Sequence, residues 1–391
     1  MTIKHKKYTL AKALGVIFIL GSVLSCKDNS VELPKTIEEE SNLLVNLETG
    51  SPMTDGTINR MTLISSEGEV ALVVANDKLG KLFAIKLDDD KPSDATNNDV
   101  NSTVTGFASE IASSLGLSLN QLGIHDMRIN PISKSIYVLA GRGQGEDRSL
   151  LVITNHGTQI ELFDFENIEY AELPYVTPGD KIQDLAWGES SIFASFRKPS
   201  TLDGEIAEIK APFSHGSVFT SRATTVYKTN WGGNYFTNAP LERLAYITVN
   251  EVPRLAGVTV CAPGFSFPVS DIHDGNGLLE VKEYFNLNTT FPWKVFGAEN
   301  NGKTYLIEHH DNGRLTRIGE KYLDGSLAEF NANAKYLLMN GGRDRVPGLT
   351  DEDVKLLAPI GTYLSVAQYS DTRAYGVALA SGDLIHDVSL F

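Results

Sequence analysis

A six-residue pattern recurs along the chain and carries a charged side chain at a fixed position. It reads apolar, polar, charged, apolar, any, apolar, and it occupies residues 58–63, 124–129, 182–187 and 241–246, with a degenerate copy at 292–296. Equivalent positions of equivalent strands point in the same direction. The third position of each copy therefore predicts a ring of mixed charges around a common centre, formed by Arg60, Asp126, Asp184, Arg243 and Lys294.

This ring has two interpretations. Loops from several repeats would converge at its centre, which is typical of a site for a polar ligand. Buried charges also need partners, so the favoured interpretation is that the five side chains pair with one another or cap neighbouring backbone groups. The two interpretations differ for Asp126→Ala, which would abolish folding in the structural case and only ligand binding in the other.

An aromatic segment is a second candidate site. Trp231, Tyr235 and Phe236 surround two glycines, and such a loop on the surface stacks on sugars or contacts a partner protein. Trp187 and Trp293 are further aromatic candidates. A turn between repeats explains the segment equally well, so both interpretations of it stay open.

Metal and catalytic chemistry have little support in the sequence. Four of the eight histidines precede an aspartate, but adjacent residues of a strand face opposite sides, so we assign no metal ligands. A metal site assembled from separate blades stays open as the less favoured alternative, and no other cofactor is assigned. The glycine-rich segment 141–148 lacks the lysine and the following helix of a phosphate-binding loop. Cys261 ends an apolar run and is expected in the core. Catalytic residues stay unassigned.

The elements that would position these residues are short β-strands. Apolar runs rich in Val, Ile, Tyr and Phe alternate with Gly, Asn and Asp turns and predict strands at residues 70–75, 82–87, 135–140, 150–154, 191–196, 224–228, 257–261, 304–308, 363–368 and 374–380. The pattern returns after roughly 50 to 65 residues, enough for four strands each time. The fold class is therefore all-β, a β-propeller of six or seven blades.

Two helical insertions and a ring closure complete the predicted fold. Helical spacing of apolar residues predicts helices at 107–122 and at 350–357, the second with Thr350 and Asp353 in a capping-box-like start. Residues 43–47 are expected to pair with the C-terminal segment and so close the ring, which removes exposed strand edges.

The N-terminus predicts export and lipid attachment. Four lysines precede an apolar run at 13–24 that is too short to cross a hydrocarbon core of roughly 30 Å, which indicates a signal peptide over residues 1–25. The run ends in Val23-Leu24-Ser25-Cys26, which resembles a bacterial lipobox and implies fatty acyl chains such as palmitate on Cys26. An ordinary secretory signal is the alternative. Residues 26–42 read as a polar tether, and residues 43–391 as a single propeller domain.

Composition excludes several classes of protein. The 391 residues include 34 Lys and Arg against 49 Asp and Glu, a formal net charge of −15, which argues against nucleic acids and anionic membrane surfaces as partners. Two cysteines exclude a disulfide scaffold and a four-cysteine metal site. The 42% of hydrophobic residues is ample for a core.

Three features resemble lipid-anchored and secreted β-propeller proteins of Bacteroidetes. They are the lipobox, the Lys27-Asp28 pair that follows it, and the repeats that pass from residues 124–129 and 182–187 into the strands at 136–139 and 192–195. The resemblance implies a propeller at the outer membrane, on its outer or its periplasmic face, and implies no reaction. Trp-Asp repeat ends and the tryptophan-docking motifs of quinoprotein dehydrogenases are missing from the sequence.

These observations favour a lipoprotein of the cell surface. We expect a binding or accessory propeller that serves a nutrient, a metallophore or an outer-membrane barrel partner, anchored in the bilayer by acylated Cys26. The alternative is an extracellular propeller enzyme, a polysaccharide lyase or hydrolase. A compact cluster of His, Tyr, Arg and carboxylates at the channel mouth would favour the enzyme.

Overall fold

A computed structural model provides the structure of the chain. Contacts divide it into residues Met1–Glu40 and Ser41–Phe391, and all of the described residues belong to the second unit. The described residues are 42–391 without 54–56, 146, 176–178, 199–200, 202, 230–234, 238–239, 261–262, 275–276, 287–291, 325–353 and 360. In this part of the chain, the structure contains no helix long and apolar enough to span a membrane.

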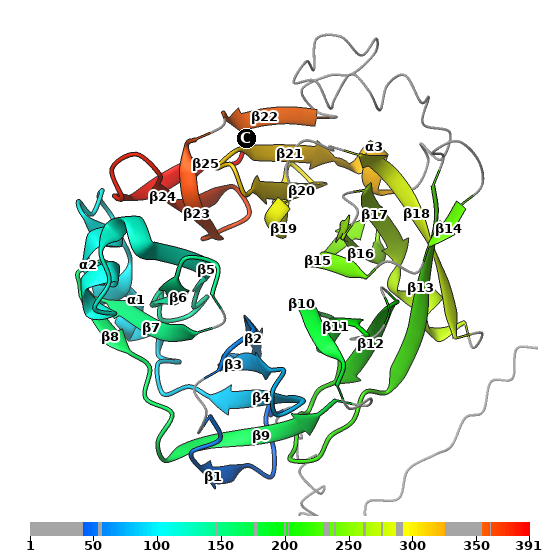
Figure 1. Ribbon diagram of the computed structural model, residues 1–391, viewed down its shortest axis with the longest axis horizontal. Coiled ribbons are helices and arrows are strands. Elements are labelled where there is room, and N and C mark those ends of the chain that lie inside the picture. Colours follow the sequence, from blue (N-terminus) through cyan, green and yellow to red (C-terminus); the bar gives the residue numbers. More distant parts are fainter. Residues whose placement is uncertain are drawn as a thin grey trace, which may run out of the picture. The chain divides into compact units, whose positions relative to one another are not determined.

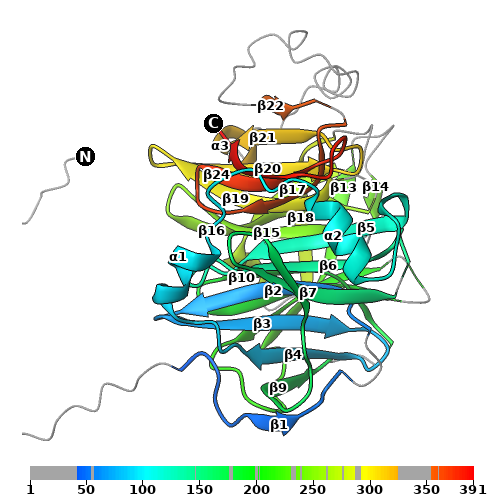
Figure 2. The ribbon, with the colours of Figure 1, turned by 90° about the vertical axis from the view of Figure 1, so that its left-hand side faces the viewer.

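Six antiparallel sheets form a six-bladed β-propeller, and we name each blade by its first, innermost strand. The β2 blade comprises β2 (Arg60–Ser66), β3 (Glu69–Asn76), β4 (Lys81–Lys86), β9 (Ile168–Pro174) and β1 (Glu48–Gly50). The β5 blade comprises β5 (Leu122–Ile129), β6 (Ile136–Arg142), β7 (Arg148–Thr154) and β8 (Gln159–Leu162). The β10 blade comprises β10 (Lys181–Gly188), β11 (Ser191–Arg197), β12 (Gly204–Lys210), β13 (Ser221–Thr229) and β14 (Tyr235–Thr237). Figure 2 shows the strands of the β2 blade one beyond another, from β2 to β1.

The other three blades follow in chain order. The β15 blade comprises β15 (Leu241–Val249), β16 (Val252–Thr259), β17 (Pro263–Pro268) and β18 (Leu278–Asn286). The β19 blade comprises β19 (Pro292–Asn300), β20 (Lys303–His310), β21 (Leu315–Gly319) and β22 (Val354–Ala358). The β23 blade comprises β23 (Tyr363–Gln368), β24 (Arg373–Ala378) and β25 (Leu384–Ser389). Strand β18 also pairs in parallel with β13, so the β10 and β15 blades are joined at their outer edges. All ten predicted strand segments coincide with strands, and the all-β propeller prediction is confirmed with six blades.

The order of blades around the ring differs from their order in the chain. The innermost strands follow one another as β2, β10, β15, β19, β23 and β5, and the ring closes from β5 back to β2 (Figure 1). The whole β5 blade lies between β4 and β9 in sequence, although β4 and β9 are neighbours in one sheet. The chain therefore builds most of the β2 blade, turns back to build the β5 blade, and then returns to finish the first one.

The predicted ring closure is wrong for this reason. Leu44 forms a parallel bridge with Phe213, and β1 pairs with β9, so the segment after the tether packs on the β2 and β10 blades. The β5 blade closes the ring instead, with β5 against β23 and a bridge between Val104 and Leu384. An internal insertion protects the edges that a terminal strand was expected to cover.

The helical predictions are half confirmed. Helix α2 (Phe107–Ser114) buries Phe107 and Ile111 against the β5 blade, and η2 (Leu119–Gln121) follows it before β5 begins at Leu122. The predicted helix at 350–357 is wrong, because Val354–Ala358 pairs with β21 as strand β22, and residues 350–353 lie outside the described residues. The hydrogen bonds gained by pairing with the free edge of β21 outweigh the weak helical propensity of this segment. The remaining short helices are η1 (Pro92–Asp94), α1 (Ala95–Asn98), η3 (Val269–His273) and α3 (Glu320–Leu323).

Apolar faces pack between neighbouring blades and hold the ring. The β2 and β10 blades share one buried cluster that contains Val73, Leu185 and Phe196. Where β10 meets β15, a side chain on Gly188 would place Cβ 2.1 Å from the Tyr246 ring. Such close packing fixes the distance of each innermost strand from the ring centre.

Candidate functional site

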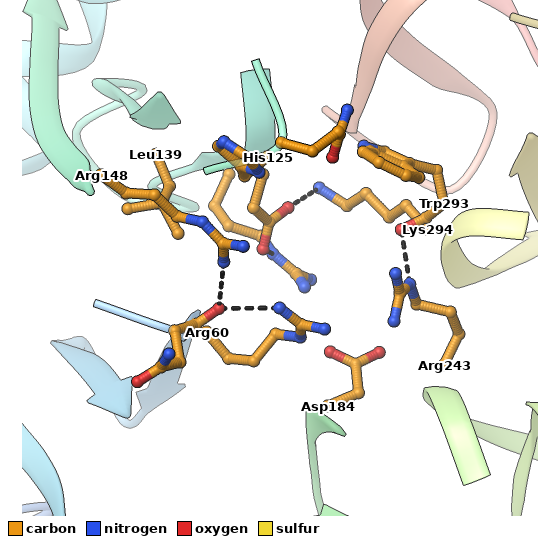
Figure 3. A pocket seen from close by; sticks show the side chains of 12 residues that line it. Arg60, His125, Leu139, Arg148, Asp184, Arg243, Trp293 and Lys294 are labelled. Atoms are coloured by element: carbon orange, nitrogen blue, oxygen red, sulfur yellow. Dashed lines mark hydrogen bonds and ion pairs between the residues drawn. The ribbon is translucent and has the colours of Figure 1, made fainter. Parts of the chain in front are cut away.

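A pocket of about 200 Å³ lies where the innermost strands converge, and we call it the central pocket. Five of the six blades contribute to it, and their side chains point toward one another in Figure 3. It is lined by Asn59, Arg60, His125, Asp126, Arg128, Leu139, Gln144, Arg148, Asp184, Arg243, Trp293 and Lys294.

All five charged residues of the predicted ring line this one pocket. Each belongs to a different blade, on β2, β5, β10, β15 or β19. The equivalent position of the sixth blade is Ser365 on β23, which is buried and carries no charge. The structure thus places the ring as the repeat indicates, and its binding function stays a prediction.

A β-bulge recurs beside the ring position. In five of the six innermost strands, all except β2, the pairing with the neighbouring strand shifts register immediately before the ring position, at Asp126, Asp184, Arg243, Lys294 and Ser365. A bulge leaves one residue out of the ladder and redirects the side chains next to it. The repeated bulge therefore explains how polar and charged side chains at two successive positions both reach the central pocket.

Several ring residues bind the backbone of the next blade. The Nε of Arg60 donates to the carbonyl of Gln183 on β10, and the Nε of Arg243 donates to the carbonyl of Trp293 on β19 at 2.7 Å. The carboxylate of Asp184 accepts the Leu244 backbone N–H at 2.9 Å. These bonds are the contacts that the structural interpretation of the ring requires, and they hold adjacent blades in register.

Asp126 forms the most complete ion-pair group of the pocket. Its two carboxylate oxygens lie 2.9 Å from the Arg128 Nε and 2.7 Å from the Lys294 Nζ, and Lys294 also donates to the carbonyl of Met127. Burial works to raise the pKa of Asp126, but the two cations outweigh it and hold that pKa below its ordinary value. Burial and the Arg128 charge lower the pKa of Lys294 to about 8.

Arg128 and Lys294 separate two hollows. Both side chains also line a second space of about 360 Å³, between the β2, β5, β19 and β23 blades. Thr62, Phe296 and Gln368 are among its other lining residues. The ion-paired group around Asp126 therefore forms a partition across the centre of the ring.

His125 contributes a neutral ring to the pocket. Burial, together with the nearby Arg148 and Arg60 charges, lowers its pKa to about 4. Its Nε2 is buried and has no hydrogen-bond partner among the described residues. The imidazole is therefore uncharged near neutral pH and can offer either a donor or an acceptor to a ligand.

Sequence reasoning missed five polar residues that line the pocket, Asn59, His125, Arg128, Gln144 and Arg148. Arg128 follows Asp126 by two positions and so shares its face of the strand, a signal that alternation in β5 contained. Gln144 lies in the glycine-rich loop between β6 and β7, and Arg148 is the first residue of β7, with its Nη1 donating to the Asn59 carbonyl at 2.8 Å. The sequence gives no sign that this segment returns to the ring centre.

The aromatic candidates are not gathered at this site, except for one. Trp231 lies outside the described residues, and Tyr235 and Phe236 form part of the edge strand β14, where only the backbone is described. Trp293 lines the central pocket, whereas Trp187 donates to the Ser65 carbonyl at 3.1 Å and packs beside Phe213. Cys26 and Cys261 both lie outside the described residues.

Metal ligands do not gather in the described part of the chain, where no group of three His, Cys, Asp or Glu side chains is arranged to hold an ion. Asp89, from the acidic run at 88–90, instead accepts hydrogen bonds from Ser133 at 3.0 Å and Asn130 at 3.1 Å. It acts as a local anchor for the loop that leaves the β2 blade.

Comparisons with known proteins assign no function to the chain. No protein-family model matches the sequence, and no curated protein is significantly similar to it. Solved structures similar to it include a hydrazine synthase of Kuenenia stuttgartiensis, at 12% identity over 83% of this chain and 81% of that chain, with a TM-score of 0.31. Another is Drosophila semaphorin 1a, extracellular domains 1–2, at 7% identity over 89% of this chain and 88% of that chain, with a TM-score of 0.34. A third is the Dos1 propeller, at 8% identity over 83% of this chain and 66% of that chain, with a TM-score of 0.32. Likenesses this distant carry no argument, and the fold rests on the six sheets themselves.

Proposed function

We propose that the chain is a lipid-anchored binding propeller of the outer-membrane surface, which holds a small polar ligand in the central pocket and works beside an outer-membrane barrel. The propeller fold supports a binding or accessory role in general. The single observation that carries the ligand site is the convergence of charged side chains from five blades on one open pocket of about 200 Å³.

The placement at the membrane rests on the sequence. The lipobox ending in Cys26 and the polar residues 27–42 describe an acylated anchor and a tether that leaves the propeller free in the aqueous phase. The chain's net charge of −15 disfavours direct adsorption of the body on anionic lipid, so acyl chains would carry the attachment.

The test is purification of the natively lipidated protein from its own outer membrane in mild detergent, followed by intact-complex mass spectrometry. We expect acyl mass on Cys26, a stoichiometric barrel protein and a small molecule that stays with the complex. Cys26→Ser is the matched control and should release the protein from the membrane. A lone protein without a ligand would contradict the accessory and binding roles together, and protection of the protein from protease on intact cells would contradict surface exposure.

The cluster of His125, arginines and carboxylates in the central pocket favours the alternative, a polysaccharide lyase, although none of the described residues that line it is a Tyr. Lys294, with a pKa of about 8, lies beside several arginines, and a lyase needs a base next to cations that neutralise a uronate carboxylate. The Lys294 Nζ is, however, committed to Asp126 at 2.7 Å and to the Met127 carbonyl. Incubation with uronate polymers decides the matter, because a lyase product absorbs in the ultraviolet and a binding protein leaves the polymer intact.

A further inference from the structure

We propose that the ligand of the central pocket is a small organic oxyanion, a carboxylate or phosphate on a unit of monosaccharide size. Arg60 and Arg243, which lie on opposite sides of Asp184 in Figure 3, hold the anionic group between them. This inference rests on the proposed function, and it names the chemical class that function leaves open. Its starting point is the charge of the pocket, which is opposite in sign to the charge of the chain.

Cations outnumber carboxylates in the pocket. Five cationic side chains line it, Arg60, Arg128, Arg148, Arg243 and Lys294, against the two carboxylates Asp126 and Asp184. The whole chain, in contrast, has 49 acids against 34 basic residues. Glu242 adds a carboxylate beside the pocket, with its Oε1 3.7 Å from the Arg243 Nη1. Buried charge normally has a counter-charge, so the excess of cations among the described lining residues favours an anionic ligand.

Arg60 shows this excess most clearly. Among the described residues it has no carboxylate within ion-pair distance, and its hydrogen bonds go to two backbone carbonyls, of Gln183 and Asn59. Burial and the positive charges of Arg243 and Arg148 lower its pKa to about 10. An anion placed between these guanidinium groups would remove the repulsion that they now exert on one another.

Donors with no partner are available for such an anion. Within the described residues, Nη2 of Arg60, Nη2 of Arg243 and both terminal nitrogens of Arg128 make no hydrogen bond to the protein. Guanidinium forks match the geometry of carboxylate and phosphate oxygens, and each such bond is charge-assisted. His125 adds a buried Nε2 that likewise has no partner among the described residues.

The walls and the size of the pocket limit the ligand further. Leu139 and Trp293 provide apolar surface, and Gln144 and Asn59 add uncharged polar groups. A volume of about 200 Å³ corresponds to roughly seven waters, at about 30 Å³ each. A polymer or a lipid headgroup layer does not fit this space, and a net charge of −15 repels extended polyanions from the rest of the surface.

The experiment compares matched probes on the full lipidated chain in non-ionic detergent, by isothermal titration calorimetry in buffer without phosphate or carboxylate. The probes are glucuronate, glucose 6-phosphate, glucose and inorganic phosphate. We expect the two charged sugars to bind at least tenfold more tightly than glucose, which differs from glucuronate only at the oxidised carbon. Binding of inorganic phosphate as tight as that of both sugars would overturn the organic part of the inference.

Substitutions locate the binding. Arg60→Gln should weaken the binding of glucuronate at least tenfold. The control is Arg254→Gln, which removes another buried arginine outside the pocket, hydrogen-bonded to Ser266 at 2.8 Å, and should leave the affinity for glucuronate unchanged. Should Arg60→Gln fail to fold, Arg60→Lys keeps the charge without the fork and should show an intermediate loss. If glucose and glucuronate bind equally tightly and Arg60→Gln has no effect on either, the inference that the ligand is an anion is overturned. A function in binding a polar ligand would survive that result. No binding of any probe overturns this inference, and the membrane-complex experiment then judges the proposed function separately.

Discussion

Two charged clusters of this propeller differ in how their charges balance. In the cluster at the rim of the β10 blade, which we call the rim cluster, Lys198 lies 2.8 Å from Glu205, and Arg222 binds both Glu205, with Nε at 2.8 Å, and Asp180 at 3.1 Å. Two cations there face two carboxylates. The central pocket has five cations and two carboxylates.

Protonation equilibria reflect the same contrast. Burial works to raise the pKa of Glu205 in the rim cluster, but Lys198 and Arg222 outweigh it and lower that pKa, so the ionised form is favoured. In the central pocket, burial and neighbouring cations lower the pKa of both Arg60 and Lys294, so their charged forms are disfavoured. Balanced clusters stabilise a fold, and a cationic excess at the mouth of a pocket is available to a ligand.

The largest effect should follow from breaking the balanced cluster. Arg222→Gln leaves Asp180, whose side chain is 1% exposed, and Glu205 without their shared cation. We expect the free energy of unfolding to fall by about 3 kcal/mol, measured by urea titration, with glucuronate affinity unchanged. Arg373→Gln, which removes an exposed pair with Asp387, is the control and should change stability by less than about 0.5 kcal/mol. A stable Arg222→Gln variant with altered affinity would contradict the distinction between the clusters.

A rise in pH should weaken binding in the central pocket. Because the pKa of Lys294 is lowered to about 8, its charge is present below that pH and is lost as pH rises through it. The charged groups that face it are Asp126, Arg128 and Asp184. The pKa of Asp126 is lowered and that of Arg128 is raised, so both stay ionised over this range. Affinity for glucuronate should therefore fall by up to about tenfold between pH 7 and 9. Lys294→Arg should remove this dependence, and a profile that stays the same in that variant would exclude Lys294 as its source.

Removal of an unbalanced cation should cost little stability. Arg60→Gln loses the bonds to the Gln183 and Asn59 carbonyls but also removes repulsion from Arg148 and Arg243. We expect the free energy of unfolding to change by less than about 1 kcal/mol, by the same urea titration used for Arg222→Gln. A loss as large as that of Arg222→Gln would mean that the ring is structural rather than available to a ligand.

The smallest effect has the opposite sign. Asp184→Asn removes a carboxylate from the pocket, while the amide oxygen can still accept the Leu244 N–H. The excess of positive charge grows, so glucuronate should bind about threefold more tightly by calorimetry. Weaker binding would show that Asp184 contacts the ligand directly as an acceptor.

Regular features of the fold were predictable from sequence because they repeat. The position of Arg60, Asp126, Asp184, Arg243 and Lys294 in the pattern follows from strand alternation and common spacing. The sixth ring position was not predictable, since Ser365 breaks the charged pattern. Gln144 reaches the pocket from a loop and Arg148 from the strand start that follows this loop, and no periodicity describes the path of a loop.

Topology was the other limit of sequence reasoning. The pattern locates each innermost strand but not its neighbours in the ring, because inter-blade contacts are made by apolar side chains of similar kind in every blade. The insertion of the β5 blade between β4 and β9 therefore had no sequence signal, and the expected closure by residues 43–47 was wrong.

The most direct test of the account is a crystal structure of the full chain grown with selenate, an oxyanion that anomalous scattering locates without ambiguity. The account predicts a selenium peak in the central pocket, with selenate oxygens about 2.7–2.9 Å from the guanidinium nitrogens of Arg60 and Arg243. Ordered water in the pocket, with selenate bound only elsewhere, would contradict it.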